Sequence, residues 1–181
     1  MSVIVVSGPP GVGGTTVAKG LAERLKLDFF CLGNYFKKQG EGDNEDEKAM
    51  RFWVTSKGSS KEFHVGMDDT QRKLAKEGDI VIQSKLGIRM LKGSYDFSVW
   101  LDAPLSVRAQ RASKRDGIPV FEAEDKILER QTLERKTWKT MYGFDYFTQE
   151  KEADIVIDTS DKKPNLIIDL IINEMKRKNI I

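Results

Sequence analysis

The sequence contains only one cysteine, Cys31, and only one histidine, His64. A chain with one cysteine forms no internal disulfide, and these two side chains are too few for a zinc site built from cysteine and histidine. We therefore expect a protein of a reducing compartment, the cytoplasm, that needs neither disulfides nor structural zinc.

Long apolar runs and an excess of one charge are also missing. No stretch approaches the roughly 18 consecutive apolar residues of a membrane-spanning helix, and no basic segment precedes an apolar run at the N-terminus. The 30 Lys and Arg nearly balance the 28 Asp and Glu, so the whole molecule has little positive field to attract nucleic acid. We expect neither a membrane nor a nucleic-acid partner.

What the sequence does contain is an alternation of short apolar runs with amphipathic segments over 181 residues, the length of one domain. This alternation predicts an α/β fold of three layers, α/β/α, in which helices cover both faces of a five-stranded parallel sheet. The predicted strands are 3–7, 27–32, 79–83, 97–101 and 153–157, and the predicted helices are 15–25, 68–76, 105–114, 122–142 and 166–177.

The segment between the second strand and the next helix has a different composition. Residues 34–63 are polar with a helical pattern, and the stretch "GEGDNEDEK" at 40–48 is too charged and glycine-rich for a core. We interpret 34–63 as a mobile flap outside the core.

The stretch "GPPGVGGTT" at 8–16 joins the first strand to the first helix. Its spacing is that of a phosphate-binding loop, in which glycines let backbone N–H groups surround an anion at the positive end of a helix. A plain glycine-rich turn is the alternative. We predict that this loop binds phosphate and that Thr15 holds Mg²⁺; the predicted binding residues are Gly8, Pro9, Pro10, Gly11, Val12, Gly13, Gly14, Thr15 and Thr16.

Gly14 occupies the position at which such a loop usually has lysine. That lysine reaches the β- and γ-phosphates and stabilises the negative charge of the transferring group. Because backbone amides bind phosphate without it, its loss affects catalysis more than binding. Lys19, about 140° around the helix from Gly14, is poorly placed to replace it.

Nearly all 181 residues resemble the P-loop nucleoside-monophosphate kinases, which are related to adenylate kinase, and among them the archaeal-type cytidylate kinases. The segments that carry the resemblance are "SGPPGVGGTTVAKGLAERL" (7–25), "LGNYF" (32–36), "DIVIQSKL" (79–86), "VWLDAPLSVRAQRASKRDG" (99–117), "MYGFD" (141–145) and "ADIVIDTS" (153–160).

The resemblance implies that the chain transfers the γ-phosphoryl group of ATP, with Mg²⁺, to CMP or to dCMP or UMP. It also implies a single domain over 1–181 that acts as a monomer or a weak homodimer. The expected parts are a core of 1–33, 64–112 and 150–181, a monophosphate-binding flap of about 34–63 and a lid of about 113–145.

On the acceptor side the sequence departs from the family's usual charges. Asn34 and Lys37 lie where the family commonly has an aspartate and an arginine, and "QSK" at 83–85 replaces Glu-Gly-Arg. Gln83 offers a dipole without a charge, whereas Lys85 keeps a positive charge without the two-pronged geometry of arginine. We predict that Asn34, Lys37, Gln83 and Lys85 bind the acceptor.

Asp68, on the predicted helix 68–76, is a further acceptor-binding prediction, since it could hydrogen-bond the edge of a base, as could Asp69 and Gln71; the alternative is that at least one of the three is solvated on the helix surface. Asp102 follows the fourth strand, where it either binds Mg²⁺ through water or caps the next helix, the second being our preferred interpretation.

Arginines recur in the region of the expected lid. Arg108, Arg111 and Arg115 share one helical face, and Arg130 follows on the next helix. We predict that Arg108 contacts ATP, and that Arg111, Arg115, Arg130 and Lys85 supply catalytic positive charge. The alternative is that these arginines are solvated and paired with neighbouring glutamates.

Three functions therefore remain open. The leading one is an ATP-dependent kinase of a CMP-like monophosphate. The second is a nucleotide-binding protein with weakened catalysis, and the third is a kinase with the same fold that acts on another small acceptor.

Overall fold

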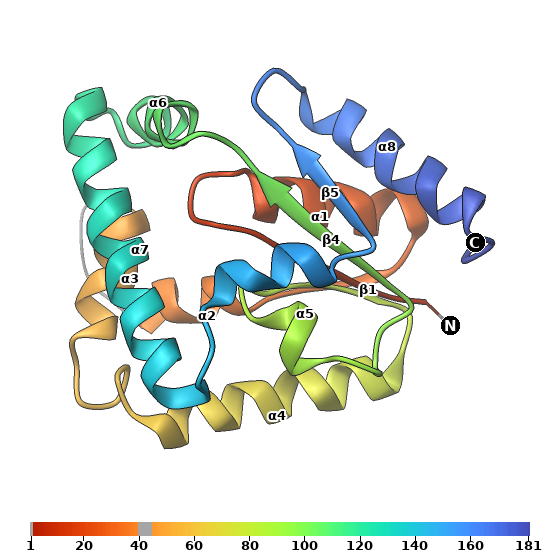
Figure 1. Cartoon of the computed structure of the whole chain (residues 1–181), viewed down its shortest axis with the longest axis horizontal. Helices are drawn as coiled ribbons and strands as arrows, with labels where there is room; N and C mark the ends of the chain where they lie inside the picture. Colours follow the sequence, from red (N-terminus) through yellow and green to blue (C-terminus); the bar gives the residue numbers. More distant parts are fainter. Residues whose placement is uncertain (1, 40–44) are drawn as a thin grey trace.

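The computed structural model describes residues 2–39 and 45–181, except the side chains at 36, 37, 39, 45, 46 and 49. Strands and helices alternate along the described residues (Figure 1). The strands are β1 (Val3–Ser7), β2 (Asp28–Cys31), β3 (Ile80–Gln83), β4 (Phe97–Asp102) and β5 (Ile155–Asp158). The helices are α1 (Gly14–Leu25), α2 (Leu32–Gln39), α3 (Glu45–Trp53), α4 (Lys61–Glu77), α5 (Gly87–Met90), α6 (Leu105–Asp116), α7 (Val120–Tyr142), the 3₁₀ helix η1 (Tyr146–Glu152) and α8 (Pro164–Arg177).

The five strands form one parallel sheet in the order β2-β3-β1-β4-β5, which confirms the predicted sheet. The central strand β1 pairs Val5 with Ile82 on one side and Val6 with Val99 on the other. Ile4, Val5 and Val6 have no exposed surface, because helices cover both faces of a parallel sheet. This double burial explains why the strands read as continuous apolar runs.

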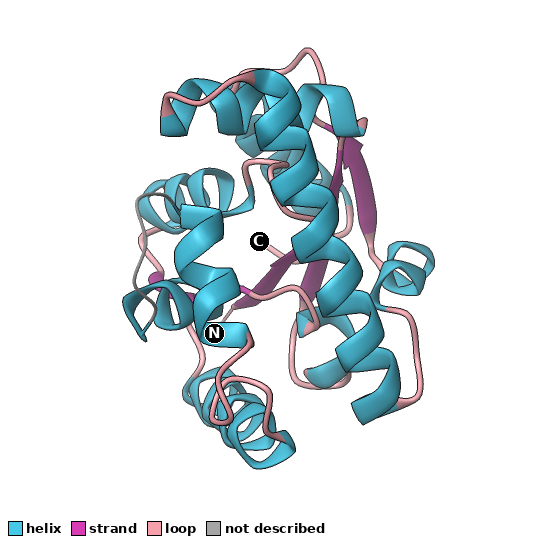
Figure 2. Cartoon of the chain, turned by 90° about the vertical axis from the view of Figure 1, so that its left-hand side faces the viewer, coloured by secondary structure: helices cyan, strands magenta, loops and turns pink. Residues whose placement is uncertain are grey.

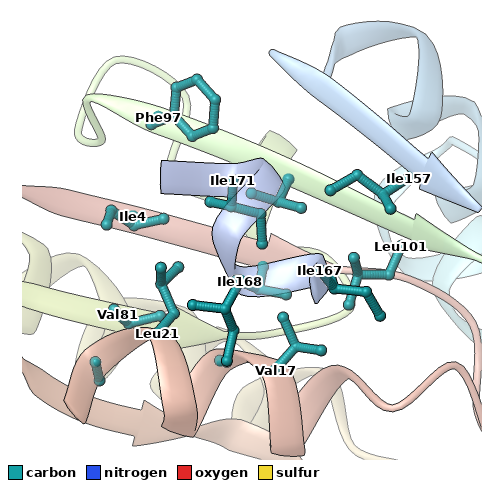
Figure 3. Close-up of a cluster of buried hydrophobic side chains, with 14 of the residues drawn as sticks. Ile4, Val17, Leu21, Val81, Phe97, Leu101, Ile157, Ile167, Ile168 and Ile171 are labelled. Atoms are coloured by element: carbon teal, nitrogen blue, oxygen red, sulfur yellow. The ribbon is translucent and has the colours of Figure 1, made fainter. Parts of the chain in front are cut away.

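Helices α1 and α8 cover one face of the sheet. Val17 and Leu21 of α1 and Ile168 and Ile171 of α8 meet Ile4 of β1 in a buried apolar cluster (Figure 3). Leu21 and Val17 are one turn apart, so α1 presents one apolar stripe to the sheet. This packing fixes the start of α1, and with it the preceding glycine loop, at the carboxyl end of β1.

The other face is covered by α4, α5, η1 and parts of α3 and α7. Its buried cluster joins Val5 and Ile82 of the sheet to aromatic side chains, among them Trp53, Trp138 and Tyr146. The three layers of the predicted α/β/α fold are therefore confirmed. Trp53, near the end of the expected flap, belongs to this core, while residues 40–44 of the charged stretch lie outside the described residues.

Helices α6 and α7 form a pair beside the sheet. They share a small apolar cluster of Ala109, Ala112, Ala123 and Ile127, and the chain turns between them at 117–119. Gly117 adopts a positive φ of 68° at the end of α6, a conformation that glycine tolerates best. Figure 2 views the molecule from the side on which α6 and α7 lie, with helices in front of the sheet.

Some elements differ from the sequence predictions. Helix α4 begins at Lys61, seven residues before the predicted start, and α5 and η1 were not predicted. A four-residue helix and a 3₁₀ helix are too short to show the 3.6-residue apolar period. No described helix is long and apolar enough to cross a membrane.

Candidate active site

The glycine loop between β1 and α1 adopts a backbone that requires glycine at two positions. A Cβ at Gly8 would lie 2.4 Å from the carbonyl oxygen of Leu101, and one at Gly11 would lie 2.8 Å from Cβ of Arg108. Gly13, with φ 87°, ends the loop as the N-cap of α1. No side chain caps α1 and its first turn has no acid, so the positive end of this helix suits an anion.

Gly14 is the first residue of α1 and faces a neutral side chain. A Cβ at this position would lie 3.4 Å from Nε2 of Gln83, an ordinary contact. The thiol of Cys31 donates a hydrogen bond of 2.9 Å to Oε1 of Gln83, and Thr15 Oγ1 lies 3.8 Å from the same sulfur. The space at the missing loop lysine is therefore bordered by a neutral amide.

A cavity of about 570 Å³ extends from this loop along the carboxyl end of the sheet. Its lining brings together most of the predicted site residues: Gly8, Pro9, Pro10, Gly11, Val12, Gly13, Gly14, Thr15, Thr16, Asn34, Asp68, Gln83, Lys85, Arg111, Arg115 and Arg130. The side chain of Lys37 lies outside the described part of the chain. Ligands of parallel α/β folds bind at this end of the sheet, which makes the cavity the candidate active site.

An ion-pair cluster of Lys85, Arg130 and Glu134 lines the cavity opposite the loop. The Glu134 carboxylate places both oxygens 2.5 Å from Nζ of Lys85, and its Oε1 accepts a 2.9 Å hydrogen bond from Nε of Arg130. The Glu134 side chain is 1% exposed, against 15% for Lys85 and 8% for Arg130. The cluster thus carries a net charge of about +1 next to the cavity.

The arginines of α6 have different partners from one another. Arg108 is buried and donates to the carbonyl oxygens of Ala103 and Pro10, each at 3.0 Å, and to Gln131. It is not among the cavity-lining residues. The arrangement gives Arg108 the role of holding the loop from behind, so the prediction that it contacts ATP finds no support here.

Arg111 and Arg115 do line the cavity. The Arg111 guanidinium donates to Thr159 Oγ1 at 2.9 Å and to the carbonyl oxygens of Thr159 and Ser160. Arg115 pairs with the adjacent Asp116. Among the arginine contacts described above, only the Arg130–Glu134 pair matches the alternative of pairing with neighbouring glutamates, and Arg130 is buried rather than solvated.

Aromatic side chains line another part of the cavity, among them Trp53, His64 and Trp138. The ring of Trp53 lies 4.7 Å from that of His64 and 5.2 Å from that of Trp138, centroid to centroid. His64 is buried, and its Nε2 lies 3.0 Å from the carbonyl oxygen of Gly58. Burial lowers the pKa of His64, because the charged imidazolium is poorly solvated there.

Asp68 is a buried carboxylate that also lines the cavity. Tyr142 donates its hydroxyl proton to Oδ2 at 2.6 Å, and Gln71 donates to Oδ1 at 3.3 Å. Burial raises the pKa of Asp68 in spite of the Tyr142 hydrogen bond, and burial together with Asp68 raises the pKa of Tyr142. Asp68 is therefore not solvated on the helix surface, whereas the neighbouring Asp69 is exposed, as the alternative expected for at least one side chain of this helix.

The described lining of the cavity offers few protein ligands to Mg²⁺. Among the described residues, no three His, Cys, Asp or Glu side chains lie close enough together to hold a metal ion. Asp102 does not cap α6, whose N-cap is Pro104 without a side-chain hydrogen bond, so that prediction is wrong. Mg²⁺ usually keeps several waters and takes its other ligands from phosphates and one or two side chains, and Thr15 suits that sparse role.

The lining also includes residues that were not assigned to the site from the sequence, and those with charged or aromatic side chains include Glu134, Trp138 and Lys162. Arg130, Glu134 and Trp138 are spaced at i, i+4 and i+8, so a common helical face was the signal for two of them. Lys162 follows β5 and pairs with Asp161, and its position after a parallel strand was the only sequence signal.

The comparisons with known proteins agree with this geometry. Residues 3–161 match the model of the cytidylate kinase-like family. The chain is 36% identical over 169 residues to a cytidylate kinase of Methanopyrus kandleri, with 87% of this chain and 84% of the relative covered. It is 35% identical over 173 residues to a cytidylate kinase of Ignicoccus hospitalis, with 94% and 97% covered.

Solved structures show the same fold at lower identity. An uncharacterized protein from Eubacterium ventriosum superposes with a TM-score of 0.72 at 19% identity, covering 97% of this chain and 98% of the other. A shikimate kinase from Aquifex aeolicus superposes with a TM-score of 0.61 at 19% identity, covering 98% of each chain. At these identities the likeness supports the fold alone.

Proposed function

The chain belongs to the cytidylate kinase-like family, and we propose that it is a kinase that transfers the γ-phosphoryl group of ATP to CMP or a related pyrimidine monophosphate. The observation that carries this proposal is a single cavity that joins the glycine loop to the cluster of Lys85, Arg130 and Glu134. Phosphoryl transfer needs a donor phosphate and an acceptor phosphate close together among positive charges, and one continuous cavity supports that requirement.

Each part of the cavity takes a proposed role. The backbone N–H groups of residues 8–16 bind the phosphates of ATP, and Thr15 holds Mg²⁺, which supplies positive charge to the phosphate oxygens. Lys85 and Arg130 bind the acceptor's phosphate, and Arg111 and Arg115 add charge from α6. Asn34 and Asp68 contact the acceptor nucleoside, and residues 34–63 and 113–145 act as the flap and the lid.

A panel of acceptors tests the proposal. Purified protein is incubated with Mg²⁺-ATP and each nucleoside monophosphate, and also with shikimate and gluconate, and ADP formation is measured. We expect turnover with at least one pyrimidine monophosphate and none with shikimate or gluconate, which are carboxylates without a phosphate group. Nucleotide binding by calorimetry without turnover would instead favour a nucleotide-binding protein, and turnover with another acceptor would replace the proposed substrate class.

Gly14→Lys tests the donor side of the same proposal. An added Cβ at Gly14 would meet only the side chain of Gln83, 3.4 Å from its Nε2, so the backbone leaves room for a side chain to begin there. A lysine here adds charge where the γ-phosphate carries it, and we expect kcat to rise about tenfold or more. Gly14→Met is the matched control, because it fills the same space without charge. Equal kcat in both variants and wild type would contradict a phosphate near position 14.

A further inference from the structure

Two cations of the cavity share one buried carboxylate. Lys85 extends from the segment after β3, whereas Arg130 and Glu134 lie one turn apart on the inner face of α7. The Lys85–Glu134 pair therefore joins two parts of the chain that are 49 residues apart in sequence. The Glu134 carboxylate thus occupies the two cations that would hold the phosphate of the proposed acceptor.

The carboxylate of Glu134 uses the donors that a phosphate would need. A phosphate, like a carboxylate, presents several oxygens to the N–H groups of lysine and arginine, and such charge-assisted hydrogen bonds are the strong ones. Both Glu134 oxygens contact Lys85, and one of them also contacts Arg130. The acceptor's phosphate and this carboxylate therefore need the same atoms.

The competition is unequal in two ways. Glu134 is attached to the chain, so its effective concentration beside Lys85 is high. A phosphate dianion carries twice the charge and more oxygens, so it displaces the carboxylate where a neutral or singly charged group does not.

We propose that Glu134 sets the affinity and charge selectivity for the acceptor, because its carboxylate competes with the acceptor's phosphate for Lys85 and Arg130. Glu134 is thus a positioning residue that favours acceptors with a dianionic phosphate. The inference rests on the proposed function, since it takes the monophosphate site to include Lys85.

Glu134→Gln tests the inference, because glutamine keeps the size of the side chain and removes its charge. At saturating Mg²⁺-ATP we expect the KM for CMP to fall about tenfold, the value of one charge-assisted hydrogen bond, with kcat unchanged. Glu129→Gln, an exposed position on the same helix, is the matched control and leaves KM unchanged. An unchanged or higher KM in Glu134→Gln overturns the inference, since a structural role alone would not lower KM.

Two further measurements keep the test decisive. Calorimetry with inorganic phosphate needs no turnover, and we expect Glu134→Gln to bind it about tenfold more tightly than wild type; equal affinities overturn the inference even if no monophosphate is phosphorylated. If Glu134→Gln does not fold, Glu134→Asp retains the charge on a shorter side chain. Its KM for CMP is expected to lie below that of wild type, and a higher KM again overturns the inference.

Discussion

The two ends of the cavity offer different kinds of group to an anion. At the loop end the groups are backbone N–H donors, hydroxyls and the neutral amide of Gln83, beside α1. At the acceptor end they are full charges, Lys85 and Arg130, each paired with Glu134. Anion binding at the loop end would therefore depend on the shape of the backbone. At the proposed acceptor end it would depend on which side-chain charges are paired with each other.

This contrast explains how the chain tolerates Gly14. A helix N-terminus and inward N–H groups stay available whatever side chain follows, so the loop end keeps an anion site without lysine. The proposed acceptor end depends more on side-chain charges, since Lys85 and Arg130 are the cations there. We therefore expect substitutions of these charged residues to lower activity more than substitutions in the loop.

Lys85→Met is therefore the change with the largest expected effect. It leaves Glu134 buried with Arg130 as its remaining cation in the cluster, and we expect kcat/KM for the acceptor to fall about a hundredfold or more. The free energy of unfolding should also fall by about 3 kcal/mol, because a buried ion pair is broken. Lys92→Met, at a largely exposed pair with Glu152, is the control. Activity within threefold of wild type would place the acceptor elsewhere.

Gly11→Ala tests the loop end through its shape. The added Cβ would lie 2.8 Å from Cβ of Arg108 in a backbone with φ 87°, so the loop must move away from α6. We expect the Kd for ATP, measured by calorimetry, to rise about tenfold.

Gly93→Ala is the matched control for that change. It has φ 82° and open space around the new Cβ, so it bears only the cost of the left-handed conformation, about 1–2 kcal/mol of stability, without any effect on ATP. If both variants bind ATP equally well, the loop's contact with Arg108 does not shape the site.

His64 gives the smallest predicted effect and concerns only the aromatic part of the cavity. Its folded pKa lies below the unfolded value of 6.5, so the unfolded chain binds the proton more readily. Stability is then independent of this group above that value and falls as the pH drops below it, with a slope of at most about 1.4 kcal/mol per pH unit. Urea unfolding of wild type and His64→Gln should show this slope in wild type only. The same slope in both proteins would assign it to other groups.

Most of the fold followed from local patterns. Val3–Ser7 and the glycines after it predicted a buried strand and a phosphate loop, and the structure has β1 and a loop that requires glycine at Gly8 and Gly11. The turn between α6 and α7 was marked by Gly117 and Pro119. These signals are local because apolar period, glycine and proline act within a few residues.

The partners of the charged side chains could not be predicted in the same way. Arg108 and Arg111 share one helical face, but the first binds carbonyl oxygens behind the loop and the second binds Thr159. Helical spacing predicts which side chains share a face of the helix, but it does not predict which parts of the chain pack against that face. The same limit applied to Asp102, which is the last residue of β4 and does not cap α6.

The sequence by itself determined the α/β/α architecture, the position of the phosphate loop and the absence of its lysine, because each follows from residues that are close together in the sequence. Only the tertiary structure decided that Gln83 borders Gly14 and that Glu134 lies between Lys85 and Arg130. The physical reason is that a charge acts on whatever the fold brings within a few ångströms of it. Lys85 and Glu134, 49 residues apart in the chain, meet only because α7 passes beside the carboxyl end of the sheet.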